Sequence, residues 1–160
     1  MNLRRHWPFL AVVAALVAVP LVVVAVNEVR RASGRHVLLR AHPIDPHDLF
    51  RGEYVQLSYD ISRLDPDAAP GARVYVPLHR VDGHWNGDRA VRRRPSGGVF
   101  IRGRAGGQFG VRIRYGIESF FVEEGKARRY EDALASGRLY ADVVLDDDGD
   151  AHLDHLVIRS

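Results

Sequence analysis

Twenty consecutive residues near the N-terminus, Trp7 to Val26, carry no charge and are almost all aliphatic or aromatic. At a rise of about 1.5 Å per residue, a helix of this length spans roughly 30 Å, the thickness of the hydrocarbon core of a bilayer. Trp7 stands at the edge of the run, where aromatic side chains favour the membrane interface. No other stretch of the sequence approaches 18 apolar residues. We therefore expect residues 7–26 to be a single-pass transmembrane anchor, in contact with the lipid bilayer, behind an N-terminal tail of residues 1–6.

A cleaved signal peptide is the alternative to an anchor. Arg4 and Arg5 make a basic start, and Val23-Val24-Ala25 offers a cleavage site. The apolar run is longer than the core of a typical signal peptide and lacks an Ala-x-Ala end, which favours an uncleaved anchor.

The arginines around the span give conflicting indications of its orientation. A count of positive charges places the following domain in the cytoplasm, because Arg4 and Arg5 precede the span and four arginines follow it: Arg30, Arg31, Arg35 and Arg40. A short basic tail before a long apolar run is, however, how signal-anchors begin, and the following flank also carries Glu28. We expect the domain to be extracytoplasmic, and the conflict with the arginine count stays open.

The rest of the chain is long enough for one domain with a real core. We take residues 27–35 as a juxtamembrane linker and residues 36–160 as a soluble β domain. The sequence contains no cysteine, which excludes a thiol nucleophile, disulfides and thiolate metal sites. It also lacks a phosphate-binding loop and a Gly-x-Ser-x-Gly elbow, and we expect no cofactor.

Charge is distributed in two opposite blocks. Residues 72–115 contain ten arginines against Asp82 and Asp88, and residues 131–155 contain eight carboxylates against Arg138. Such blocks either pair inside the fold or present two faces to different partners. A set of arginines could form one basic sheet face: Arg92, Arg93, Arg94, Arg102, Arg104, Arg112 and Arg114. The simpler interpretation is a solvated face that is partly neutralised by the acidic C-terminal third. For a membrane-tethered domain, a basic face is better suited to anionic lipid head groups than to nucleic acid, because no interleaved series of aromatic residues that could stack on bases accompanies these arginines.

Alternation with a period of two dominates the domain and predicts half-buried strands. It is clearest in residues 55–61, 74–78 and 111–115, and turn signals such as Asp82-Gly83 and Asp148-Gly149 separate the strands. One helix is predicted from Lys126 to Ser136, ended by Gly137. Residues 139–145 and 151–158 are predicted to form a hairpin. The expected fold is mainly β, an antiparallel sandwich or partly open barrel with one short helix.

The segment from Pro43 to Tyr59 holds the densest group of turn, charged and aromatic residues. It resembles the signature of the GDYxxLxY family of bacterial membrane-anchored proteins, matched here at Gly52, Tyr54, Leu57 and Tyr59. The resemblance continues through residues 115–118 (Tyr-Gly-Ile-Glu) and 121–125 and so covers most of the domain. The aspartate of the signature is Glu53 here, which keeps the charge but lengthens its reach. A catalytic carboxylate placed to a fraction of an ångström tolerates this poorly, so the substitution argues against enzymatic activity.

The resemblance implies no established activity, and it implies an association with multi-pass membrane proteins. Our first hypothesis is a non-enzymatic, membrane-tethered accessory or binding protein of the bacterial cell envelope. The alternative is a membrane-anchored hydrolase that uses carboxylates such as Glu53, Glu118 and Glu124. The structural interpretation of the signature segment is a turn that enters a central strand. The candidate binding residues are Asp48, Arg51, Gly52, Glu53, Tyr54, Tyr59, Tyr115, Glu118 and Glu124.

Eight histidines raise the question of a metal site, and we predict none. His152 and His155 are three apart, which on a regular strand places them on opposite faces. His42 and His47 flank Asp45 in an expected loop, where solvated side chains are the simpler interpretation. The aspartates at 146–150 fit a hairpin turn better than a calcium loop, because the first and twelfth loop positions would be Val144 and His155.

Overall fold

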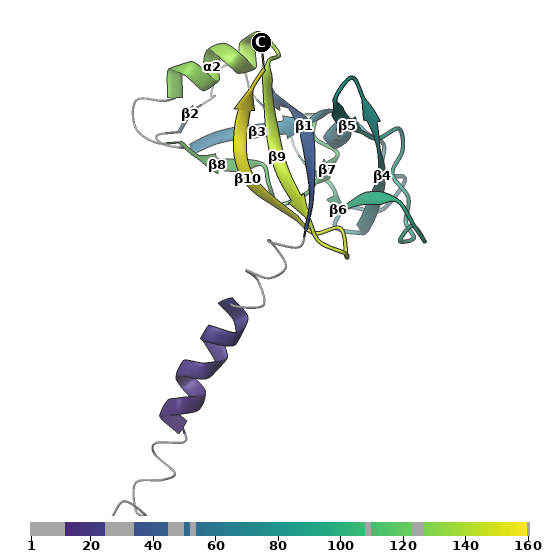
Figure 1. Ribbon diagram of the computed structural model, residues 1–160. Coiled ribbons are helices and arrows are strands. Elements are labelled where there is room, and N and C mark those ends of the chain that lie inside the picture. Colours follow the sequence, from purple (N-terminus) through teal and green to yellow (C-terminus); the bar gives the residue numbers. More distant parts are fainter. Residues whose placement is uncertain are drawn as a thin grey trace, which may run out of the picture. The chain divides into compact units, whose positions relative to one another are not determined.

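The computed structural model describes residues 12–24, 34–44, 50–51, 54–107, 110–122 and 127–159. The chain forms two compact units, Met1–Gly34 and Arg35–Ser160. In the first unit, residues 12–24 form a helix whose large apolar side chains are exposed, Leu16 at 70% and Leu21 at 62% (Figure 1). Among the described residues, no helix has the length and apolar character that crossing a membrane requires. The rest of the expected anchor, the N-terminal tail and most of the linker lie outside the described residues.

In the described residues, the second unit is a single curled sheet of ten strands, with one α-helix and one 3-10 helix. The elements are β1 (Arg35–Pro43), β2 (Phe50–Arg51), β3 (Tyr54–Tyr59), η1 (Asp60–Arg63), β4 (Arg73–Val81), β5 (His84–Asn86), β6 (Val99–Ala105), β7 (Ile113–Arg114), β8 (Ser119–Phe121), α2 (Ala127–Ala135), β9 (Leu139–Leu145) and β10 (Ala151–Ile158). The protein is therefore mainly β, as predicted.

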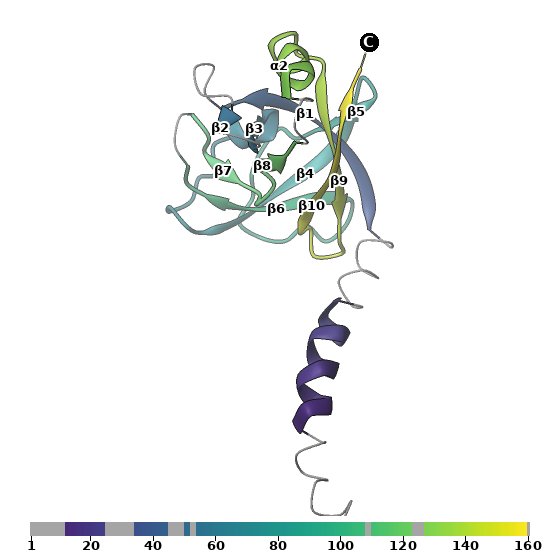
Figure 2. The same ribbon diagram turned by 90° about the vertical axis from the view of Figure 1, so that its left-hand side faces the viewer.

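Strand β1 organises the sheet because it pairs with three others. The main path of strands runs β10-β9-β1-β5-β4-β6-β7, and β3 joins it through β1 while also pairing with β2 and β8. Figures 1 and 2 show the sheet curled into a half-barrel, with α2 at the end where the C-terminus lies. The half-barrel is the closer of the two predicted architectures, because the strands belong to one sheet and not to two stacked ones.

The core lies inside the curl and takes alternate residues from each long strand. Val74, Val76 and Leu78 of β4 are buried, as the alternation predicts, and their neighbours in the strand are more exposed. Strands β1 and β9 contribute in the same way, for example through Leu39 and Val143. Burial of such side chains stabilises the fold by about 1.5 to 3 kcal/mol each.

The predicted C-terminal hairpin and helix are confirmed. The hairpin of β9 and β10 has the predicted bounds, and α2 lies within the predicted helix, with Gly137 in the left-handed region at φ +64°. The turn of the hairpin is built on Asp146, whose carboxylate accepts the backbone N–H groups of Asp148 and Asp150 at 2.9 and 2.8 Å. This is the hairpin turn that we preferred to a calcium loop.

Four predictions need correction. Ile61 belongs to η1 and not to a strand, and the strand expected over residues 111–115 is reduced to Ile113 and Arg114. The sheet is not wholly antiparallel, because β1 and β5 run parallel where Leu39 pairs with Trp85. The face assignment of His152 and His155 is wrong. A β-bulge between Leu153 and His155 shifts the register, so that these histidines lie opposite residues 144 and 142, which share one face of β9.

Candidate functional site

The signature segment divides into an exposed tyrosine and a buried part. Tyr54 is 52% exposed and lies opposite Phe121 of β8, with the two rings edge to face at 5.5 Å between centroids. Leu57 and Tyr59 are completely buried in the core. The two tyrosines thus point to opposite faces of β3, as their spacing predicts.

Tyr59 and Tyr115 fasten two distant segments to each other. The hydroxyl of Tyr59 donates to the carbonyl of Ile117 at 2.7 Å, and the hydroxyl of Tyr115 donates to the carbonyl of Ile61 at 2.8 Å. Burial, and secondarily the charge of Glu118, raise the pKa of both hydroxyls well above the usual range. Both tyrosines therefore stay neutral donors, and we call this pair of hydrogen bonds the tyrosine latch.

Glu118 shapes the turn that carries one end of the latch. Its carboxylate accepts the backbone N–H groups of Tyr115 and Gly116 at 2.5 and 3.0 Å. Gly116 has φ +83°, a conformation that side chains with a Cβ rarely adopt. On the neighbouring strand, a Cβ at Gly103 would meet the ring of Tyr115 at 2.9 Å, so a glycine there leaves room for the ring.

Beside this turn lies a cleft of about 390 Å³. Its lining is dominated by arginines from three neighbouring strands, together with the turn residues and one aspartate: Arg73, Arg102, Gly103, Arg104, Arg114, Tyr115, Gly116, Glu118 and Asp150. Four guanidinium groups against two carboxylates make this a cationic cleft. Of the predicted site residues, Tyr115 and Glu118 line the cleft. Tyr59 does not line it but is hydrogen-bonded to the neighbouring Ile117 through the latch.

Three of the arginines form a row across the sheet. Arg73 of β4 lies directly opposite Arg104 of β6, and Arg104 lies directly opposite Arg114 of β7. Side chains in such positions have Cβ atoms about 4.5 to 5.5 Å apart, and like charges there destabilise a sheet. All three arginines are exposed, and none forms an ion pair with a carboxylate among the described residues. An anion bound in the cleft would relieve this repulsion.

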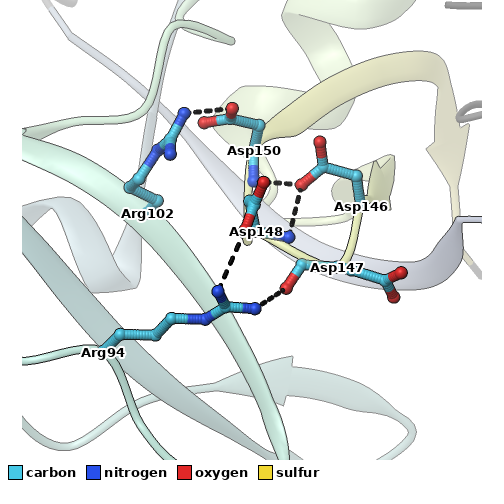
Figure 3. Close-up of polar contacts among 6 residues, drawn as sticks. All are labelled: Arg94, Arg102, Asp146, Asp147, Asp148 and Asp150. Carbon is cyan, nitrogen blue, oxygen red and sulfur yellow. Dashed lines mark hydrogen bonds and ion pairs between the residues drawn. The ribbon is translucent and has the colours of Figure 1, made fainter. Parts of the chain in front are cut away.

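The acidic turn between β9 and β10 contributes Asp150 to the lining of the cleft. Asp150 pairs with Arg102, while Arg94 pairs with Asp148 at 3.0 Å and donates to the carbonyl of Asp147 at 2.7 Å (Figure 3). The basic block (residues 72–115) and the acidic block (residues 131–155) therefore form ion pairs with each other in the fold, but only some of their charges are paired in this way. Outside the turn, Arg92 and Arg112 pair with aspartates at 67 and 65. Among the described residues, the positive charge of the cleft that is not paired with a carboxylate is therefore concentrated in the row of three arginines.

A protein-family model for GDYXXLXY proteins matches residues 16–156, which is most of the chain. The chain belongs to the GDYXXLXY family. The signature of a GDYXXLXY protein is thus partly explained by packing, because Leu57 is in the core and Tyr59 holds the latch. No curated protein and no solved structure shows significant similarity to this chain.

Several predicted site residues of this GDYXXLXY protein stay predictions. Asp48, Gly52, Glu53 and Glu124 lie outside the described residues, and for Arg51 the structure gives only the pairing of its backbone with Tyr54 in β2 and β3. From the sequence, Arg102, Arg104 and Arg114 are predicted only as part of a basic face, and Arg73 and Asp150 are not predicted as site residues. The alternation of β4, β6 and β7 could place these arginines on one face, but only the strand register aligns them.

Proposed function

We propose that this GDYXXLXY protein is a non-enzymatic, membrane-tethered binding protein of the cell envelope. Its β domain recognises an acidic group on a membrane-protein partner through the cationic cleft. The observation that carries the proposal is the row formed by Arg73, Arg104 and Arg114 across three strands. A row of like charges costs folding free energy, and a carboxylate or phosphate ligand converts that cost into binding energy.

The chemistry of the cleft favours binding over hydrolysis. Hydrolysis by carboxylates needs a pair of acidic groups available to the substrate. In the cleft, both oxygens of Glu118 accept backbone N–H groups, and Asp150 is paired with Arg102. Guanidinium groups, in contrast, hold a planar anion through two parallel hydrogen bonds. Tyr54 and Phe121 add an exposed aromatic pair on a neighbouring part of the sheet, which suits the apolar portion of a protein partner.

The tether rests on the sequence of residues 7–26 and on the exposed apolar side chains of the helix over residues 12–24. We propose an extracytoplasmic location for the domain. Protease added to spheroplasts then digests the domain without prior lysis of the membrane.

The test of binding is a crosslinking experiment with full-length protein in its native membranes. Arg104→Glu reverses the charge at the centre of the row, and Arg93→Glu makes the same change of net charge at an exposed arginine outside the cleft. We expect Arg104→Glu to reduce the recovery of the crosslinked membrane partner by about 10- to 100-fold, because a charge-assisted hydrogen bond is worth about 1.5 to 3 kcal/mol. Arg93→Glu should change recovery by less than about twofold. Equal losses in both variants would mean that net charge alone attracts the partner, and the cleft would not be the binding site.

A further inference from the structure

A cluster of two histidines and two aspartates lies on the outer side of β1, β9 and β10, apart from the cleft. His36 Nδ1 lies 3.0 Å from Asp142 Oδ1. His155 Nδ1 lies 3.0 Å from Asp154 Oδ2, and its Nε2 lies 3.9 Å from Asp142 Oδ2. Asp142 is the least exposed of the four and contacts both histidines.

The β-bulge in β10 is the reason for this cluster. On a regular strand, Asp154 and His155 would point to opposite faces. At the bulge the pairing passes from Leu153 opposite Val143 directly to His155 opposite Asp142, so that Asp154 is the extra residue. Asp154 and His155 both reach the side of the sheet on which Asp142 lies, because His155 Nε2 is 3.9 Å from Asp142 Oδ2 and a carboxylate oxygen of Asp154 is within 4.8 Å of one of Asp142.

The distances in the cluster are close to those that a metal ion requires. Bonds from a transition metal to imidazole nitrogen and carboxylate oxygen are about 2.0 to 2.2 Å long, so two ligand atoms of one ion lie at most about 4.4 Å apart. Ligand atoms of His36, Asp142 and Asp154 all lie within 4.8 Å of one another. This spread is slightly wider than one ion allows, so small side-chain rotations are needed to bring the three ligands onto it. His155 lies outside this group of three but contacts both aspartates, so it becomes a fourth ligand only after a further rotation.

The donor set selects the kind of ion. Imidazole is a good ligand for zinc and related transition metals, whereas calcium and magnesium prefer oxygen ligands alone. Two carboxylates with two neutral histidines carry a charge of −2, which a divalent cation neutralises. The four groups come from three strands of the sheet, a rigid support that holds the ligands close together before an ion binds.

We propose that His36, Asp142, Asp154 and His155 form a binding site for a divalent transition-metal ion of the zinc type. The site joins the first strand of the domain to its C-terminal hairpin, so a bound ion cross-links β1 and β10 through β9. Because both ends of the domain are tied at this point, metal binding stabilises the folded state.

The test is calorimetric titration of the tag-free, full-length chain with ZnCl₂ after treatment with a chelator. We expect one equivalent of zinc to bind and to raise the melting temperature. Asp142→Asn and His155→Gln should each weaken binding by at least about tenfold, since even substitutions behind the ligands cost about 10- to 100-fold in metal affinity. His152→Gln is the matched control. It removes an exposed histidine from the same strand, opposite Val144 and outside the cluster, and it should leave affinity within about twofold.

Two results would overturn the proposal. One is the absence of saturable zinc binding to the wild-type chain, which would leave the cluster as a set of His–Asp hydrogen bonds that only support the sheet. The other is equal weakening by His152→Gln and His155→Gln, which would indicate adventitious binding to surface histidines. Thermal melts in the absence of zinc show whether each variant folds. If Asp142→Asn does not fold, Asp154→Asn takes its place, because Asp154 is exposed.

Discussion

Removing the hydroxyl of Tyr59 tests the role assigned to the tyrosine latch. In Tyr59→Phe the ring is kept, but the buried carbonyl of Ile117 loses its 2.7 Å hydrogen bond. A buried polar group left without a partner costs about 1 to 3 kcal/mol. For a domain of this size, about 1 kcal/mol shifts the melting temperature by about 3 to 5 °C, so we expect a decrease of about 3 to 15 °C.

The assay is thermal unfolding of the full-length chain followed by circular dichroism. Tyr75→Phe is the control, because the Tyr75 ring is half-buried against Phe100 and its hydroxyl makes no hydrogen bond to any described residue. It should change stability by less than about 0.5 kcal/mol. A decrease for Tyr59→Phe no larger than that of Tyr75→Phe would refute the latch. The double variant Tyr59→Phe, Tyr115→Phe then measures the coupling between the two hydrogen bonds.

Alkaline pH gives a second measurement of the same feature. Burial raises the pKa of the Tyr59 and Tyr115 hydroxyls, whereas in the unfolded chain they ionise near their ordinary value of about 10. Above that pH the unfolded state binds fewer protons than the folded state, so stability falls as pH rises, by up to about 1.4 kcal/mol per pH unit for each tyrosine. The double variant should lose stability less steeply above pH 10 than the wild type.

Two further predictions concern the anchor and the acid side of the pH range. Replacing Val13 and Leu16 with arginine should release the protein from the membrane fraction or block its insertion, because each central arginine costs about 2.5 to 3.5 kcal/mol; unchanged fractionation would contradict the anchor. The hydrogen bond from His42, at 2.7 Å, lowers the pKa of Asp60, so its contribution to stability is present above about pH 4 and is lost as pH falls through the folded-state pKa. In thermal melts, the wild type should be more stable than Asp60→Asn by under about 1 kcal/mol, because the site is partly exposed. This difference in stability should shrink between pH 7 and pH 3. A difference that does not depend on pH would contradict the role of the Asp60 carboxylate.

The elements that could be predicted are those encoded within a short stretch of chain. The bounds of β9 and β10 follow from their alternation and from the Asp-Gly turn between them, and the end of α2 follows from Gly137. The helix over residues 12–24, which lies within the apolar run at residues 7–26, is equally local, and so is the opposite orientation of Tyr54 and Tyr59 on β3. Such signals depend only on backbone conformation and on which side chains avoid water, so the sequence alone was sufficient for them.

The candidate site and the latch depend on contacts between residues far apart in the chain, and only the tertiary structure decided them. The latch joins Tyr59 to Ile117, and the arginine row joins three strands between residues 73 and 114. The register that aligns them is set by how the whole core packs, and a shift of one residue would turn every side chain of a strand to its other face. The bulge beside His155 is such a shift, confined to one point, and it places a histidine where a regular strand would have turned it away.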